Sequence, residues 1–152
     1  MRVSARADYA VRAALELAAA RDGDPVKAEA IAEAQGIPHK FLESILNDMR
    51  RGRIVVSQRG GNGGYRLAAP PEKISIADVI RAVDGPLVSV RGERPPELSY
   101  TGPAESLQPM WIAVRANVRR ILGEVTLADV AAAKLPSVVA NLVEPPEAWT
   151  NP

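Results

Sequence analysis

Hydrophobic positions at helical spacing dominate the first fifty residues of the chain. Residues 4–20 are rich in Ala and contain neither Gly nor Pro, which predicts a helix. A shorter helix is predicted for residues 26–35, because Gly36 stands where a left-handed C-terminal cap is needed. A third helix is predicted to begin at Pro38, since the missing N–H group of proline is harmless in a first helical turn.

The third helix has the clearest buried face of the three. Its apolar residues follow one another at steps of 1, 3, 1 and 3 residues and are Phe41, Leu42, Ile45, Leu46 and Met49. Two helices joined by a tight turn that contains Gly form a helix-turn-helix. Taken alone this pattern is weak evidence, because any corner between two helices is similar.

A small β-hairpin is predicted directly after this helix pair. Strand-like segments at 54–56 and 64–68 flank a glycine cluster, in which Asn62-Gly63 is the strongest short hairpin signal. A helix-turn-helix followed at once by a hairpin is a winged helix. The predicted fold class is therefore mainly α with a small β-hairpin wing.

The second half of the chain is predicted to be helical around one long loop. Ser75 has the spacing of a helix cap and begins a short helix that ends before Gly85. Residues 86–106 show no sustained period and form the loop, which at this length is functional or mobile. A long helix capped by Ser106 and a short one capped by Thr126 follow.

Composition excludes several classes of site. A chain of 152 residues with 47% apolar and 24% charged residues is long enough for one globular domain. Cysteine is absent and His39 is the single histidine, so disulfides, thiolate metal sites, cysteine-held iron–sulfur clusters and multi-histidine sites are excluded. No apolar run is long enough for a membrane span, and the expected location is the cytoplasm.

Positive charge is concentrated in one segment, although the whole chain carries a net charge of only +1. Residues 49–71 contain five arginines and no acidic residue. Such a local cluster is typical of a contact with a polyanion such as nucleic acid, and a solvated face is the alternative. Arg59 stands at the hairpin tip, where it could enter a minor groove or simply lie in solvent.

The third helix would present polar residues to a major groove. Lys40, Glu43 and Ser44 lie in its first half, with Asn47 further along. A merely solvated face is the alternative, above all for Glu43 and Asn47. The glycine cluster fits no phosphate-binding motif, because strand leads to strand and no Lys-Ser/Thr pair follows. No catalytic residues are assigned, since no triad or placed carboxylate pair is present.

The predicted long helix carries an apolar stripe that is longer than the small remaining core of the same chain could cover. The candidate dimer-interface residues on this stripe are Leu107, Trp111, Val114, Val118, Ile121 and Leu122. A twofold dimer formed through this helix would place two wings about 34 Å apart, which is one turn of DNA. Packing against the first helix of the same chain is the alternative, and both arrangements can hold together.

The chain resembles the Rrf-type family of bacterial transcription regulators. The resemblance covers residues 1–133, and its most specific part is Ser57-Gln58-Arg59-Gly60 with Gly63-Gly64-Tyr65. It implies a homodimer that binds a palindromic operator in double-stranded DNA, usually as a repressor. The DNA-contacting positions that it implies, together with those predicted above, are Lys40, Phe41, Glu43, Ser44, Arg59, Gly60, Asn62, Gly63 and Tyr65.

Two departures from the family pattern change these expectations. Cluster-binding members carry three cysteines in the loop before the dimer helix, and the corresponding loop here has none. The chain is therefore expected to need no cofactor and no metal, and to respond to a small-molecule effector or a partner protein. The second departure is Gly52-Arg53, where the family has glycine just before the Ile-Val pair, so that the helix is expected to end one residue earlier.

The predicted domains follow from this combination. They are a winged helix-turn-helix DNA-binding domain, a cysteine-free loop, dimerisation helices and an irregular tail, at residues 1–85, 86–106, 107–135 and 136–152. The predicted function is a DNA-binding transcriptional regulator without enzymatic activity and without a membrane partner. A regulator that senses a metabolite or partner, and an interaction module that has lost DNA binding, are the alternatives.

Overall fold

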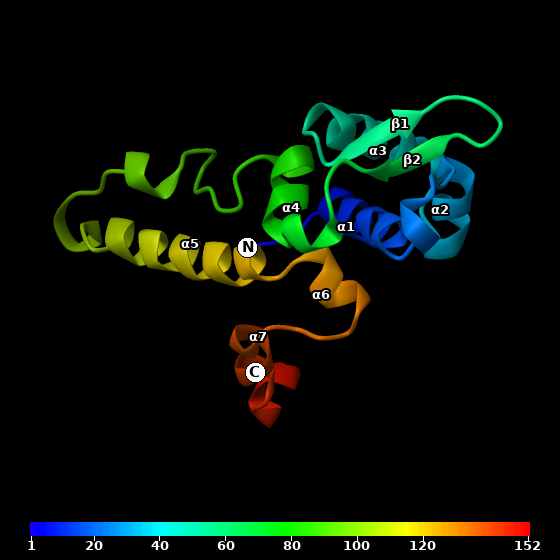
Figure 1. The fold of residues 1–152 in the computed structure, drawn as a ribbon. Coiled ribbons are helices and arrows are strands. Elements are labelled where there is room, and N and C mark those ends of the chain that lie inside the picture. The colour runs from blue at the N-terminus through cyan, green and yellow to red at the C-terminus, as the bar shows by residue number, and fades with distance from the viewer.

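The computed structural model describes all residues 1–152 as helices around a single hairpin (Figure 1). The helices are α1 (Ala5–Ala18), α2 (Ala28–Gln35), α3 (His39–Arg51), α4 (Ile76–Asp84), α5 (Leu107–Glu124), α6 (Leu127–Ala131) and α7 (Ser137–Val143). The strands β1 (Val55–Gln58) and β2 (Gly64–Leu67) form one antiparallel sheet. Short 3-10 turns cover residues 21–23, 71–73, 95–97, 102–104 and 146–149. The predicted fold class is confirmed.

The corner between α2 and α3 forms as the sequence predicts. Gly36 ends α2 in the left-handed conformation, with φ of 61°, and a side chain is disfavoured there. Ile37 follows and is buried. Pro38 occupies the N-cap of α3, so α3, the helix expected to face the major groove, begins at His39.

The C-terminus of α3 explains the Gly52-Arg53 departure. The N–H groups of Arg53 and Ile54 donate to the carbonyls of Arg50 and Met49 at 3.1 and 2.8 Å, which is the Schellman hydrogen-bond pattern. The left-handed position of this motif is occupied by Arg53, with φ of 59°. Gly52 is needed one residue earlier, because a Cβ atom there would lie 2.7 Å from the Cβ of Ala82 on α4.

The hairpin turn differs from the prediction. Gln58 pairs with Gly64, so the connection is the five-residue loop 59–63 and not a two-residue turn at Asn62-Gly63. Two-residue turns of that type need positive φ at both central residues, and neither Asn62 nor Gly63 has it. The loop instead reverses at Gly60, with φ of 108°, and its carbonyl accepts the N–H of Gly63 at 3.0 Å. We call residues 55–67 the wing.

Capping boxes position the helices of the second half. The Ser75 hydroxyl accepts the backbone N–H of Asp78 at 3.1 Å, and the Asp78 carboxylate accepts the N–H of Ser75 at 2.9 Å. Thr126 and Asp129 make the same pair of bonds at the start of α6. Ser106 precedes α5 as predicted, but its side chain makes no capping bond.

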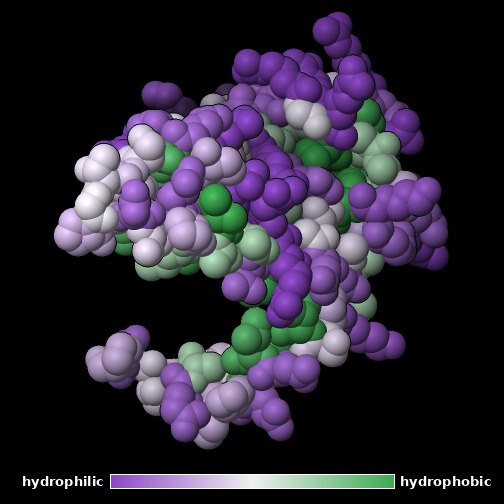
Figure 2. Space-filling model, turned by 90° about the vertical axis from the view of Figure 1, so that its left-hand side faces the viewer, coloured by the Kyte–Doolittle hydropathy of each residue, from purple (hydrophilic) through white to green (hydrophobic).

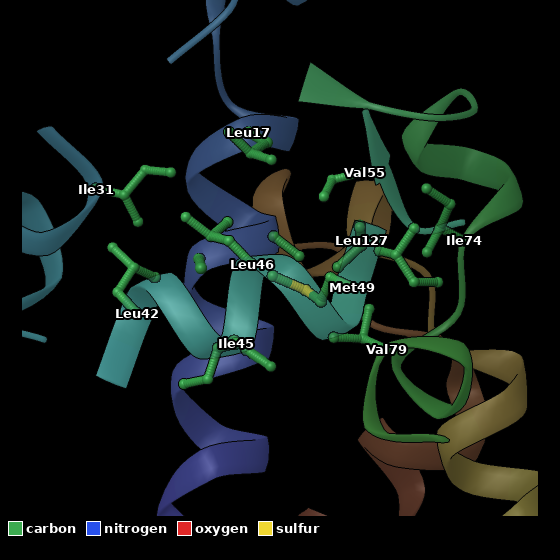
Figure 3. Close-up of a cluster of buried hydrophobic side chains, with 14 of the residues drawn as sticks. Leu17, Ile31, Leu42, Ile45, Leu46, Met49, Val55, Ile74, Val79 and Leu127 are labelled. Carbon is green, nitrogen blue, oxygen red and sulfur yellow. The ribbon is translucent and has the colours of Figure 1, made fainter. Parts of the chain in front are cut away.

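One buried cluster holds these elements together (Figure 3). The apolar stripe of α3 faces this cluster, and Leu42, Ile45, Leu46 and Met49 are fully buried. Phe41 was predicted on the same stripe, but it is 60% exposed. It turns outward because Leu42, one residue further along α3, occupies the inward position beside Ile45. Leu127 of α6 enters the cluster as well.

The tail differs from the irregular segment that the sequence predicted. Residues 137–143 form α7, and the backbone N–H groups of Val139 and Ala140 donate to the carbonyl of Pro136. The two prolines at 145 and 146 end the regular helix and obscured the short apolar period before them. Figures 1 and 2 show this arm projecting from the body below α6, with hydrophobic surface near its junction.

Replacement of Ser75 with Ala should lower the free energy of unfolding by about 1 kcal/mol, because it leaves an N–H group of α4 without its cap. Urea denaturation followed by circular dichroism measures this difference. The exposed Ser89, which makes no side-chain hydrogen bond, is the matched control for Ser→Ala. Equal stability of the Ser75→Ala and Ser89→Ala variants would contradict the capping role.

Candidate nucleic-acid interface

The N-terminal half of α3 presents an exposed surface of mixed chemistry. Lys40, Glu43 and Ser44 lie in solvent, as the sequence predicted for a groove-facing helix, and Phe41, which was predicted on the buried stripe, lies there as well. The buried side chains between them face the cluster of Figure 3, so α3 is held by its inner face while its outer face stays accessible. A cation, an aromatic ring, a carboxylate and a hydroxyl are therefore carried on one rigid element.

Neighbouring side chains restrict two of these groups. The His39 ring lies between two carboxylates, with Nδ1 3.5 Å from Glu43 Oε1 and Nε2 3.7 Å from Glu29 Oε1. The Ser44 hydroxyl accepts a hydrogen bond from Arg6 of α1 at 3.2 Å. Glu43 and Ser44 thus have polar neighbours within the chain before any ligand binds.

Asp48, further along α3 than Glu43, is neutralised within the fold. Asp48 forms ion pairs with Arg6 and, at 3.3 Å, with Arg51. Asn47 accepts a hydrogen bond from Arg50 at 2.8 Å. To contact a base in the groove, the Asn47 side-chain oxygen would have to give up this bond. Repulsion of a polyanion by Asp48 is accordingly reduced.

The wing adds cations that no carboxylate of the chain neutralises. Arg59, Gly60 and Asn62 are exposed in the loop at its tip, as Figure 1 shows for the loop between β1 and β2. Arg59 and Arg66 form no ion pair, and neither does Lys40 on α3. Because these charges have no internal partner, they remain available to an external anion.

Gly63 and Tyr65 hold the wing in place and are not part of its exposed tip. Gly63 is buried, and a Cβ atom there would lie 2.2 Å from the carbonyl oxygen of Gln58. Tyr65 is half-buried against the core, and its backbone exchanges two hydrogen bonds of 2.8 Å with Val26, just before α2. The pairing of Val26 with Tyr65 was not predicted from the sequence, since an isolated bridge of one residue leaves no periodic signal.

A shallow hollow of about 300 Å³ connects the wing to the start of α3. His39 and Glu43 line it from the helix, and Gly60 and Gly63 line it from the wing. The structure therefore brings together the two segments that the sequence predicted as one interface. The Val26–Tyr65 bridge ties the wing to the segment before α2, the helix that precedes α3.

Replacement of Gly63 with Ala should weaken DNA binding, because the added methyl group forces the wing loop to open. Gly61→Ala is the matched control: no atom lies within 4 Å of the position of its Cβ, and its φ is not positive. Fluorescence anisotropy with a labelled duplex measures both variants. We expect a loss of about tenfold for Gly63→Ala and less than twofold for Gly61→Ala, on the scale of one lost contact. Equal affinities would show that the loop conformation is irrelevant to binding.

The predicted dimer stripe on α5 divides into two parts. No residue of α5 is buried within the single chain. Val118 and Leu122 face the body and line a pocket together with Ile80 of α4. Leu107 is 36% exposed, and Trp111, Val114 and Ile121 are half-exposed. Two further apolar residues, Met110 and Ile112, are 43% and 38% exposed, and neither was among the predicted interface residues.

The model of the Rrf2 family, described as an iron-dependent transcriptional regulator, matches residues 3–133. The residues present do not fit iron: the chain has no cysteine, and no group of three His, Asp or Glu side chains is placed to hold a metal ion. The loop 86–106 contains no cysteine or histidine, and its three glutamates, Glu93, Glu97 and Glu105, belong to no group of three such ligands. No helix combines the length and apolar character needed to span a bilayer.

Related proteins share most of the chain. A Mycobacterium tuberculosis (strain H37Rv) protein named as an HTH-type transcriptional regulator is 52% identical over 144 residues, which are 95% of this chain and 89% of the relative. The regulator CymR of Bacillus subtilis is 30% identical over 131 residues, which are 86% of this chain and 90% of the relative. These relatives are transcriptional regulators and not enzymes.

Solved structures of such regulators have the same fold. CymR, titled the global cysteine regulator of B. subtilis, superposes with a TM-score of 0.75 and 29% identity over 88% of this chain and 98% of its own. IscR of T. potens superposes with a TM-score of 0.70 and 30% identity over 88% of each chain. The family match, the relatives and the winged fold agree, and the chain belongs to the Rrf2 family of transcriptional regulators.

Proposed function

We propose that the protein binds double-stranded DNA as a homodimer and represses transcription from a palindromic operator, without an iron–sulfur cluster. The observation that carries this proposal is the pairing of an exposed α3 face with a wing whose cations have no internal partner. Counterion release from DNA phosphates rewards unpaired cations of this kind. The membership of the Rrf2 family supports the same conclusion.

Each side chain has a role in this proposal. Lys40 and Ser44, at the N-terminal end of α3, would contact base edges or phosphates in the major groove. Glu43 would accept a hydrogen bond from cytosine and would disfavour bases that present only acceptors. Arg59 would enter the adjacent minor groove, where the negative electrostatic potential favours a guanidinium group.

The homodimer is supported by the exposed apolar surface of α5. Although Val118 and Leu122 face the body, no residue of this 18-residue helix is fully buried, so apolar surface remains available to a partner. Pairing with α5 of a second copy would cover Leu107, Met110 and Trp111. A twofold axis there would place two copies of the α3 face on one side of the dimer, as a palindromic site requires.

Selection of duplexes from a random pool tests this proposal. We expect the enriched sequences to contain an inverted repeat, and two chains to bind each duplex in sedimentation. A reporter gene placed behind the enriched sequence should be expressed less when the protein is present. Dimerisation without any enrichment would favour an interaction module that keeps the fold but does not bind DNA.

A further inference from the structure

A cluster of arginines lines a cleft far along the chain from the wing. Arg81 of α4, Arg94 of the loop 86–106, and Arg115 and Arg119 of α5 surround a cavity of about 460 Å³. We call it the arginine cleft. Gly85, Pro86 and Leu87 complete its wall, so only one lining residue is hydrophobic. An adjoining hollow shares Arg81 and Arg119 and adds Arg120.

The charges of the cleft are not balanced by the fold. Asp78 lies 3.8 Å from Arg81, whereas Arg94, Arg115 and Arg119 form no ion pair. Two carboxylates close to the cleft arginines in the sequence form no ion pair with them and accept other hydrogen bonds. Asp84 accepts a hydrogen bond from the Ser4 hydroxyl, and Glu97 accepts the backbone N–H of Arg94.

Like charges held at this spacing repel one another. Arg115 and Arg119 are four residues apart on α5, where side chains are neighbours and equal charges destabilise a helix. Ion pairs, by contrast, are present at four-residue spacing elsewhere in the chain, as between Asp8 and Arg12. A bound anion would remove the repulsion among three elements at once.

The position of the cleft distinguishes it from the DNA-contacting surface. Figure 1 shows the loop 86–106 and α5 extending from α4 on the side away from α2 and the wing. The loop is fastened to α5 by the side-chain amide of Gln108, which donates to the carbonyls of Pro96 and Leu98 at 3.2 and 2.5 Å. The Arg94 side of the cleft is therefore held at a set distance from its α5 side.

We propose that the arginine cleft binds a small metabolite with two or more negative charges, carried by phosphate or carboxylate groups. Guanidinium groups match both kinds of oxyanion through paired hydrogen bonds. The cavity volume suits a compact ligand, and four guanidinium groups among the seven lining residues favour an anionic one. Because α4 also packs against α1 and α3, occupancy of the cleft would bias the DNA-binding unit. This regulatory part rests on the proposed function, whereas the binding site does not.

Calorimetric titration of the full-length protein with pyrophosphate and with citrate, at constant ionic strength, tests the site. We expect saturable binding of at least one of these probes and much weaker binding of acetate. The variants Arg115→Gln and Arg94→Gln should each weaken that binding at least tenfold. The second variant lies on the exposed loop and keeps the test valid if α5 tolerates no change. Saturation by pyrophosphate alone indicates a phosphate ligand, and by citrate alone a carboxylate ligand.

Arg21→Gln is the matched control, because it removes one charge at a side chain that is 93% exposed and outside the cleft. Equal weakening by Arg21→Gln, or the absence of saturable binding, would overturn the proposed site. Duplex affinity is measured separately without the probes. If Arg115→Gln lowers that affinity while the fold is intact, the cleft arginines contact DNA and the inference fails. If wild-type protein binds no duplex, the proposed function fails and the titration still decides the site.

The regulatory part has its own measurement. The probe that saturates the cleft should change duplex affinity by at least fivefold at constant ionic strength, and Arg115→Gln should remove the change. By linkage, the duplex must alter the affinity for the probe by the same factor. An unchanged duplex affinity at saturation would overturn the regulatory role.

Discussion

Replacement of Arg59 with Gln is expected to weaken binding to the selected operator by about 1–3 kcal/mol, which is roughly 5- to 150-fold. The guanidinium group is exposed at the wing tip and has no carboxylate partner to leave behind. The loss should therefore come almost entirely from the DNA contact and not from the stability of the fold. Thermal denaturation of this variant should match that of the wild type.

The same variant should change how binding depends on salt. The slope of log K against log salt concentration should fall in magnitude by about 1, because one fewer counterion is released. Fluorescence anisotropy over a series of salt concentrations measures both quantities. Arg21→Gln, which makes the same charge change at an exposed side chain outside α3 and the wing, should leave affinity and slope unchanged. An Arg59→Gln variant with wild-type affinity at every salt concentration would remove the wing from the mechanism.

Two glutamates on the exposed part of α5 should separate the subunits. In the variant with Leu107→Glu and Met110→Glu, like charges would face one another across the twofold axis. The dimer dissociation constant should then rise by about 100-fold or more, given a penalty of about 3 kcal/mol or more for unpaired charges at an interface. Both side chains are substantially exposed within one chain, so the monomer itself should fold normally.

Sedimentation equilibrium measures the association, and circular dichroism checks the fold. Val56→Glu is the control, because Val56 is an equally exposed apolar residue, 38% exposed, that lies on β1 and not on α5. It should remain dimeric. We further expect the double variant to bind a full operator no better than a half-site. A variant that stays dimeric would place the interface on another surface.

The repeating apolar pattern made the helices predictable, whereas single residues that depart from the pattern could not be recognised from the sequence. Gly36 and the capping residues Ser75 and Thr126 mark helix ends through local chemistry that the sequence displays directly. Phe41 is hydrophobic like its buried neighbours, and only the way in which α3 packs against the core directs its ring toward solvent. The same limit applies to α7, whose apolar residues lie between prolines.

The sequence indicated residues of the candidate interface, but not the strand pairing that positions them. Charge and helix phase indicated Arg59, Lys40, Glu43 and Ser44, whereas Phe41 was placed on the buried stripe and became a candidate only through the family resemblance. The five-residue wing loop depends on a pairing of Gln58 with Gly64, and strand register is a tertiary property that Asn62-Gly63 alone does not determine. The arginine cleft was not predicted at all, because its members are separated by as many as 38 positions in the chain and only folding brings them together.

The salt dependence of wild-type binding to the selected duplex tests the central claim most directly, namely that α3 and the wing form a cationic DNA-binding surface. The account predicts a straight line in log K against log salt, with a loss of roughly a thousandfold or more between about 50 and 200 mM if a dimer makes six or more phosphate contacts. An affinity that does not change with salt, or no measurable affinity at the lowest salt concentration, would contradict it.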